Sequence, residues 1–164
     1  MKYRNIIFLL FIIIAVLGIM AIRKRTRKNR KSRSRRGGFK EKFQTQHKSI
    51  LDTPLKACSL PTEKTTGFYR NGYCSTGPTD TGTHVVCAKV DNEFLEYTKS
   101  KGNDLITPQN SFPGLVAGDK WCLCALRWKE AYNAGVAPKL IPEATSDVAT
   151  KYVLKNILMN HALG

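Results

Sequence analysis

The chain has 164 residues, of which 42% are hydrophobic and 24% charged, and its formal net charge is +15. Fourteen of the 27 Lys and Arg residues lie within residues 1–42, which contain one acidic residue, so the rest of the chain has a net charge of only +2. A nucleic-acid binder that is basic over its whole surface is therefore excluded, and the composition predicts one domain of ordinary size behind a basic N-terminal segment.

Residues 6–22 contain no charged side chain and predict a transmembrane helix. A helix of that length spans about 25 Å, near the lower limit for crossing a bilayer, and Tyr3 and Asn5 extend it into the interface. The alternative is a cleaved signal peptide, but no small-x-small cleavage site follows the apolar run. We therefore predict that residues 1–22 form a retained single-pass membrane anchor.

A dense cluster of basic residues follows this anchor. The positive-inside rule keeps such a cluster in the cytoplasm, which predicts an N-terminus outside and a C-terminal domain in the cytosol, where thiols are reduced. The cluster also predicts contact with anionic lipid headgroups of the bilayer; sequence-independent contact with nucleic acid near the membrane and a nuclear-localisation signal are the alternatives. Its members are Arg23, Lys24, Arg25, Arg27, Lys28, Arg30, Lys31, Arg33, Arg35 and Arg36.

Residues 23–50 are predicted as a basic juxtamembrane segment and linker, and residues 51–164 as the folded domain. Within it, residues 67–83 carry a glycine every five residues and predict an ordered, turn-rich loop. A phosphate-binding loop would need a strand before these glycines and a helix after them. The residues that follow, 84–90, read instead as a buried strand.

Helices and short strands alternate in the rest of the domain. Asp91 is predicted to cap a helix over residues 93–102 with Phe94, Leu95 and Thr98 on its inner face. A strand is predicted to begin at residue 121 and to be followed directly by a helix that ends at Gly135. A further strand is predicted over residues 134–144.

Two more helices complete the predicted domain. Thr145 or Ser146 is predicted to cap a short helix. A final helix over residues 154–164 would point Leu154, Ile157 and Leu158 inward. The pattern predicts an α+β domain with short strands and three to four helices.

The domain contains five cysteines: Cys58, Cys74, Cys87, Cys122 and Cys124. An odd number of cysteines on the reducing side of a membrane argues against a disulfide framework. If the domain lay on the opposite side of the membrane, two disulfide bridges and one free thiol would be expected.

Three roles for these cysteines stay open. A zinc site would gather them from separate loops with His84, although the only close pair is C-x-C. A nucleophilic cysteine needs a base such as His84, but three-residue spacing puts His84 and Cys87 on opposite faces of a strand, so His84 would have to face Cys74 or Cys122. The interpretation we favour is packing: Cys122 and Cys124 share one strand face and meet aliphatic side chains.

Three stretches carry a resemblance to a known family. They read GFYRNGYCSTGPTDTGTHVVCA, EFLEYTKSKGNDLITP and FPGLVAGDKWCLCALRWKEAYNAGVAP. Over about residues 51–161 the chain resembles the mainly bacterial family of uncharacterised proteins catalogued as domain of unknown function 2237. The resemblance includes the five cysteines and His84, but Tyr73 and Ser146 stand where the family commonly has a cysteine and a histidine. Those departures weaken the case for a metal here.

The resemblance implies no activity, and the anchor is not part of it. A domain of this family fused to a membrane anchor suits a protein of a viral or host membrane. We predict a single-pass membrane protein that presents a binding or structural module to the cytosol. The alternatives are a membrane-tethered thiol- or metal-dependent enzyme, with zinc as its cofactor, and a tether for nucleic acid or anionic lipid. The polar and aromatic residues predicted to support a site are Arg70, Asn103, Asp104, Asp119, Trp121 and Glu143.

Overall fold

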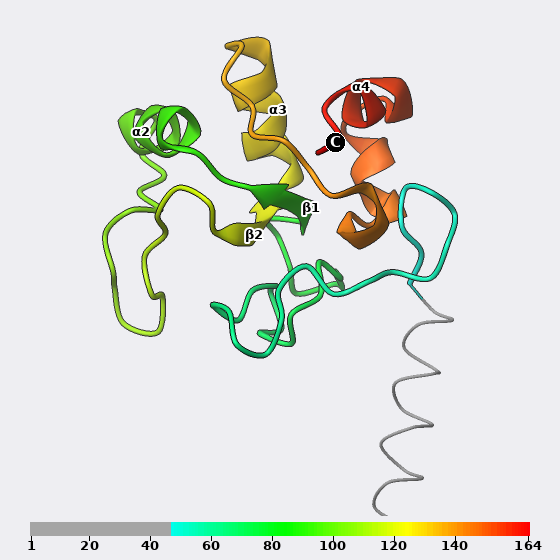
Figure 1. Cartoon of the computed structure of the whole chain (residues 1–164), viewed down its shortest axis with the longest axis horizontal. Helices are drawn as coiled ribbons and strands as arrows, with labels where there is room; N and C mark the ends of the chain where they lie inside the picture. The colour runs from blue at the N-terminus through cyan, green and yellow to red at the C-terminus, as the bar shows by residue number, and fades with distance from the viewer. Residues whose placement is uncertain (1–46) are drawn as a thin grey trace, which may run out of the picture. The chain divides into compact units, whose positions relative to one another are not determined.

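Residues 47–164 are the part of the chain that the computed structural model describes (Figure 1). The elements in chain order are strand β1 (His84–Lys89), helix α2 (Asn92–Ser100), strand β2 (Lys120–Cys124), helix α3 (Ala125–Asn133), 3₁₀ helices η1 (Pro142–Ala144) and η2 (Asp147–Lys151), and helix α4 (Lys155–Asn160). The predicted α+β class is confirmed for these residues, with one two-stranded sheet and three α-helices.

The predicted anchor, residues 1–22, and the basic cluster after it lie outside the described residues. Across residues 47–164, no helix has both the length and the apolar character needed to cross a bilayer.

Strands β1 and β2 pair antiparallel at the centre of the domain, as two short apolar runs are expected to do. Cys87 lies opposite Cys122, and a β-bulge between His84 and Val86 leaves His84 opposite Cys124. Residues opposite each other in a sheet share a face, and so do residues two apart on one strand. The extra residue of the bulge therefore places His84 on the same face as Cys87, and the prediction of opposite faces was wrong.

Helices α2 and α3 form where their sequence signals predict. The Asp91 carboxylate accepts a hydrogen bond from the Phe94 N–H at 2.8 Å, and Gly102 beyond the helix end takes φ +78°. The predicted inner face of α2 is buried: Phe94, Leu95 and Thr98. Helix α3 follows β2 without a linker, so the strand determines where the helix begins.

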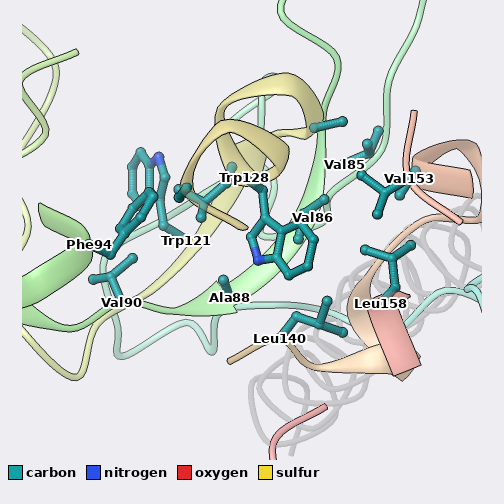
Figure 2. Packing of buried hydrophobic residues seen from close by; sticks show 14 of the residues in the cluster. Val85, Val86, Ala88, Val90, Phe94, Trp121, Trp128, Leu140, Val153 and Leu158 are labelled. Carbon is teal, nitrogen blue, oxygen red and sulfur yellow. The ribbon is translucent and has the colours of Figure 1, made fainter. Parts of the chain in front are cut away.

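The main hydrophobic core lies between the sheet and the helices (Figure 2). Trp128 of α3 is fully buried at its centre, close to Val86 and Leu158. Its indole N–H donates to the Pro138 carbonyl at 3.1 Å, so the one polar atom of the ring is satisfied. This core holds β1, β2, α3 and α4 together without help from the cysteines.

Residues 56–83 form a turn-rich layer on the side of the sheet away from α2, α3 and α4, whereas residues 47–55 lie beside η1 and η2 (Figure 1). The interior of this layer is mostly polar, because residues 56–83 bury two cysteines and no aliphatic side chain. Thr66 connects it to the sheet by accepting a hydrogen bond from the Cys122 N–H at 2.8 Å. A layer with so little apolar surface needs other interactions to stay in place.

The predicted strand over residues 134–144 does not form. Pro138 and Pro142 lack the N–H that a sheet ladder needs, and only Leu140 makes isolated bridges, to Ala88 and Ala162. The inner face of α4 was also predicted incorrectly in part, because Leu158 is buried while Leu154 is 67% exposed. Leu154 is the N-cap of the short helix and precedes its first turn.

Candidate functional site

The cysteines form two disulfides, Cys58–Cys87 and Cys74–Cys122, and Cys124 is free. The prediction against a disulfide framework was therefore wrong for this structure. It was drawn from the odd number of cysteines and from the compartment that the positive-inside rule assigned, and not from the spacing of the cysteines. Each bond joins the turn-rich layer to one strand, so together they cross-link that layer to both strands of the sheet.

The four bonded sulfurs form one buried cluster. Cys58, Cys74, Cys87 and Cys122 are at most 2% exposed and pack with Ala144 and Ile141. The strand face that carries Cys122 therefore meets other cysteines, and the prediction that it meets only aliphatic side chains was wrong. The disulfides take the place of the hydrocarbon core that the turn-rich layer lacks.

A cleft of about 350 Å³ opens beside this cluster. Four apolar or aromatic side chains and two basic ones make up most of its wall, a composition typical of sites for small molecules. The lining residues are Gly67, Phe68, Arg70, His84, Leu105, Phe112, Trp121 and Cys122. Three residues that the sequence singled out, Arg70, His84 and Trp121, are thus brought together.

The His84 imidazole is held in one orientation in the cleft. Its Nδ1 lies 2.6 Å from Oδ1 of Asp80, a carboxylate whose side chain is fully buried. An ionised carboxylate can only accept, so Nδ1 carries the proton and Nε2 is left as the acceptor. Phe68 stacks on the ring with centroids 6.1 Å apart, and a Cβ on Gly82 would overlap the ring.

Asp80 stays ionised despite its burial. Burial by itself raises the pKa of Asp80, but this is outweighed by hydrogen bonds from the His84 backbone N–H at 2.9 Å, the His84 ring, and the Thr76 hydroxyl at 3.0 Å. The pKa of Asp80 therefore lies below its ordinary value.

Arg70 stacks on the indole of Trp121 in the same cleft. Its guanidinium carbon lies 4.9 Å from the ring centroid, a cation–π contact, and the Trp121 ring meets Phe112 edge-on at 5.5 Å. Within residues 47–164, no carboxylate pairs with the Arg70 guanidinium. An exposed guanidinium held by an aromatic ring is available to an anionic group of a ligand.

The backbone is strained at the rim of the cleft. Arg70 has φ +50° and Thr83, directly before His84, has φ +51°. Left-handed backbone is uncommon for arginine and more so for a β-branched residue, and costs about 1–3 kcal/mol. The surrounding structure therefore holds both basic side chains of the cleft by strained backbone, a feature that clusters at functional sites.

Cys124 has no catalytic partner in this structure. It lies opposite His84 in the strand register, but among the described residues no hydrogen bond joins its thiol to the imidazole. Cys122 does line the cleft with His84, but its sulfur is bonded to Cys74. The predicted nucleophile–base pair is therefore not assembled.

The other predicted polar residues lie outside the cleft and support the fold. Asn103 donates to the Thr98 hydroxyl at 2.9 Å below α2, and Asp119 accepts from Lys64 at 2.6 Å and from the Val116 N–H at 2.9 Å. The Glu143 carbonyl accepts from the Lys56 N–H at 2.9 Å. These residues hold loops in place.

Asp104 makes the domain sensitive to acid. Hydrogen bonds from the N–H and hydroxyl of Thr107 and from the Ile106 N–H lower its pKa to about 2. A carboxyl whose folded pKa is depressed stabilises the fold above its unfolded pKa of about 3.9, and this contribution is lost as the pH falls toward 2. We expect the unfolding midpoint of Asp104→Asn to fall less steeply between pH 4 and pH 2, measured by thermal unfolding followed by circular dichroism. Unfolding midpoints that fall equally steeply with pH in Asp104→Asn and in the unmodified chain would contradict this.

The fold and the site together define a small cysteine-rich α+β domain, in which two disulfides fasten a turn-rich layer to a two-stranded sheet beside an aromatic cleft. The chain belongs to the family described as "Uncharacterized protein conserved in bacteria (DUF2237)", which matches residues 48–162, well over half of the chain. No curated protein matches the chain. The predicted family is thus confirmed, and the anchor lies outside the matched residues.

Sequence reasoning missed Asp80, Phe68 and Phe112. Asp80 had a readable signal, because an acidic residue four positions before a histidine in a tight loop can reach the imidazole. Phe68 and Phe112 had none, because each meets its partner, His84 or Trp121, only through the fold.

Proposed function

We propose that the chain is a membrane-anchored binding module whose cleft takes a small molecule with an apolar ring and an anionic group. The observation that carries the proposal is the Arg70 guanidinium, stacked on Trp121 in the cleft and free of any carboxylate in the described residues. The aromatic walls would cover the ring of the ligand. Arg70 would bind its carboxylate or phosphate, and His84 would form part of the wall beside it.

Membrane attachment belongs to the same proposal. Residues 6–22 would span the bilayer, and the basic residues 23–36 would contact anionic lipid headgroups, with nucleic acid near the membrane as the alternative. The charge distribution supports a domain on the cytosolic side. A zinc site formed by the cysteines also remains a proposal. In this structure the four buried sulfurs that would bind the ion are paired in disulfides.

Phenyl phosphate is a suitable probe of the cleft. We expect it to change the fluorescence of Trp121 in the full chain in detergent, while the fully buried Trp128 contributes a constant background. Arg70→Gln should weaken binding by about tenfold or more, since a hydrogen bond to a charged group is worth about 1.5–3 kcal/mol. Benzyl alcohol, which lacks the anionic group, should bind more weakly than phenyl phosphate.

Arg127→Gln is the matched control, because Arg127 pairs with Glu130 on α3 and does not line the cleft. It should bind phenyl phosphate like the unmodified chain. Equal affinity of the unmodified chain and Arg70→Gln for phenyl phosphate would refute the proposed role of the cleft.

A further inference from the structure

We infer that Cys58, Cys74, Cys87 and Cys122 bind one zinc ion once the two disulfides are reduced. This inference is independent of the ligand proposed for the cleft. It starts from the position of the sulfurs, which come from four separate places in the chain: two in the turn-rich layer, one on β1 and one on β2.

The geometry suits a tetrahedral metal. The sulfurs of Cys58, Cys74 and Cys87 all lie within 4.8 Å of one another. Three atoms at that spacing lie within about 2.8 Å of a common point, which compares with a zinc–sulfur distance of about 2.3 Å. A contraction of about half an ångström would bring these three sulfurs to bonding distance. The fourth sulfur, that of Cys122, is bonded to Cys74 and is not one of the three, so reduction of this bond has to free it to turn toward the same point.

The chemistry of the donors selects the metal. Four thiolates form a soft donor set, which favours zinc over the oxygen-binding magnesium and calcium ions. All four cysteines are at most 2% exposed, and Ala144 and Ile141 are their apolar neighbours, so water is kept from the site. Ser75, directly after Cys74, has a buried hydroxyl without a hydrogen-bond partner in the described residues.

The reaction balances with a reductant and one metal ion. A phosphine reductant supplies two electrons to each disulfide and becomes a phosphine oxide, and one water molecule provides its oxygen and the protons of the two thiols. One zinc ion then replaces the four thiol protons, which pass to solvent. Oxidation of the four thiolates to two disulfides releases the ion again.

Zinc would also do structurally what the disulfides do. It would join the same four positions and so keep the turn-rich layer on the sheet in a compartment where disulfides are reduced. The cytosolic orientation predicted from the charge distribution is such a compartment. Cys124 stands apart from the four: it is free, partly exposed, and at the end of β2.

The test compares the reduced and oxidised forms of the full chain in detergent, both carrying Cys124→Ser, so that no variant of the cluster is needed. After reduction with a phosphine and its removal without air, we expect one equivalent of cobalt(II) to bind with a thiolate-to-cobalt charge-transfer band. One equivalent of zinc should displace it and raise the melting temperature. The oxidised chain should bind neither ion at this stoichiometry.

A second comparison assigns the ligands. Cys58→Ser combined with Cys74→Ser should abolish the charge-transfer band, whereas Cys124→Ser alone should keep it. Failure of the reduced chain to take up cobalt or zinc would overturn the inference. Equal uptake by the oxidised chain would also overturn it, because the bound metal would then lie elsewhere.

Discussion

Replacing Cys74 and Cys122 together with alanine should lower the free energy of unfolding by about 4 kcal/mol in the absence of zinc. The bond closes a loop across a sequence separation of 48, and the entropy that it removes from the unfolded chain grows with loop length. At about 4 °C per kcal/mol for a domain of this size, the melting temperature should fall by about 15 °C. Guanidinium unfolding of the oxidised chain measures the difference.

The loss has a second cause in the folded state. The turn-rich layer, residues 56–83, buries no aliphatic side chain and so has little hydrocarbon with which to hold itself to the sheet. We expect the variant to lose the cleft before it loses the main core. Amide hydrogen exchange should become fast over residues 58–83 and stay slow in α3.

Two matched variants separate the cross-link from the loss of a sulfur. Cys58→Ala with Cys87→Ala removes a bond with a separation of 29 and should cost about 3.5 kcal/mol, slightly less than the longer loop. Cys124→Ala removes a free thiol and should be close to neutral. If the Cys74 and Cys122 variant unfolded at the same guanidinium concentration as Cys124→Ala, the cross-link would not be the source of stability.

The predicted compartment and the observed disulfides point in opposite directions. Charge around residues 6–22 predicts a cytosolic domain, and disulfides are typical of oxidising compartments. The zinc inference removes the conflict, because the same four cysteines would then cross-link the fold in either compartment. The redox state of these four cysteines in cells therefore indicates on which side of the membrane the domain lies, as well as which cross-link stabilises the fold.

Local signals in the sequence predicted the regular elements best. The cap residue Asp91, the spacing of Phe94, Leu95 and Thr98, and the closing Gly102 all act within one helix, so no distant residue could override them. The strand predicted over residues 134–144 failed for the opposite reason. The segment pairs with β1 at one isolated bridge, Leu140 to Ala88, with one hydrogen bond on either side of it, because the prolines prevent a longer ladder.

The candidate site depended on long-range contacts that no local pattern encodes. Arg70 and Trp121 are 51 positions apart and meet only because the turn-rich layer is fastened to β2. The face of His84 depended on one bulged residue, which a period-two reading of the strand does not include. The pairing of the cysteines was open for the same reason, since each of the five could be the free one and the other four then allow three connectivities.

Asp80→Ala should lower the free energy of unfolding by about 2–4 kcal/mol and release the His84 imidazole from its fixed orientation in the cleft. The substitution leaves the His84 backbone N–H, the His84 ring and the Thr76 hydroxyl without their shared acceptor. Each hydrogen bond to a charged group is worth about 1.5–3 kcal/mol, and three bonds to one carboxylate add up to less than their sum. The pKa of Asp80 is depressed in the fold. The loss of unfolding free energy relative to the unmodified chain should therefore be complete above about pH 4 and become smaller below it.

The same substitution tests whether Asp80 positions the imidazole or only stabilises the loop. Nitrogen-15 chemical shifts of His84 should show the proton on Nδ1 in the unmodified chain and shared between the two nitrogens in Asp80→Ala. Asp91→Ala is the matched control, because this carboxylate accepts one backbone N–H at the α2 N-cap and its loss should cost only about 1 kcal/mol. An unchanged His84 tautomer in Asp80→Ala, with stability reduced no more than in Asp91→Ala, would show that Asp80 does not orient the cleft.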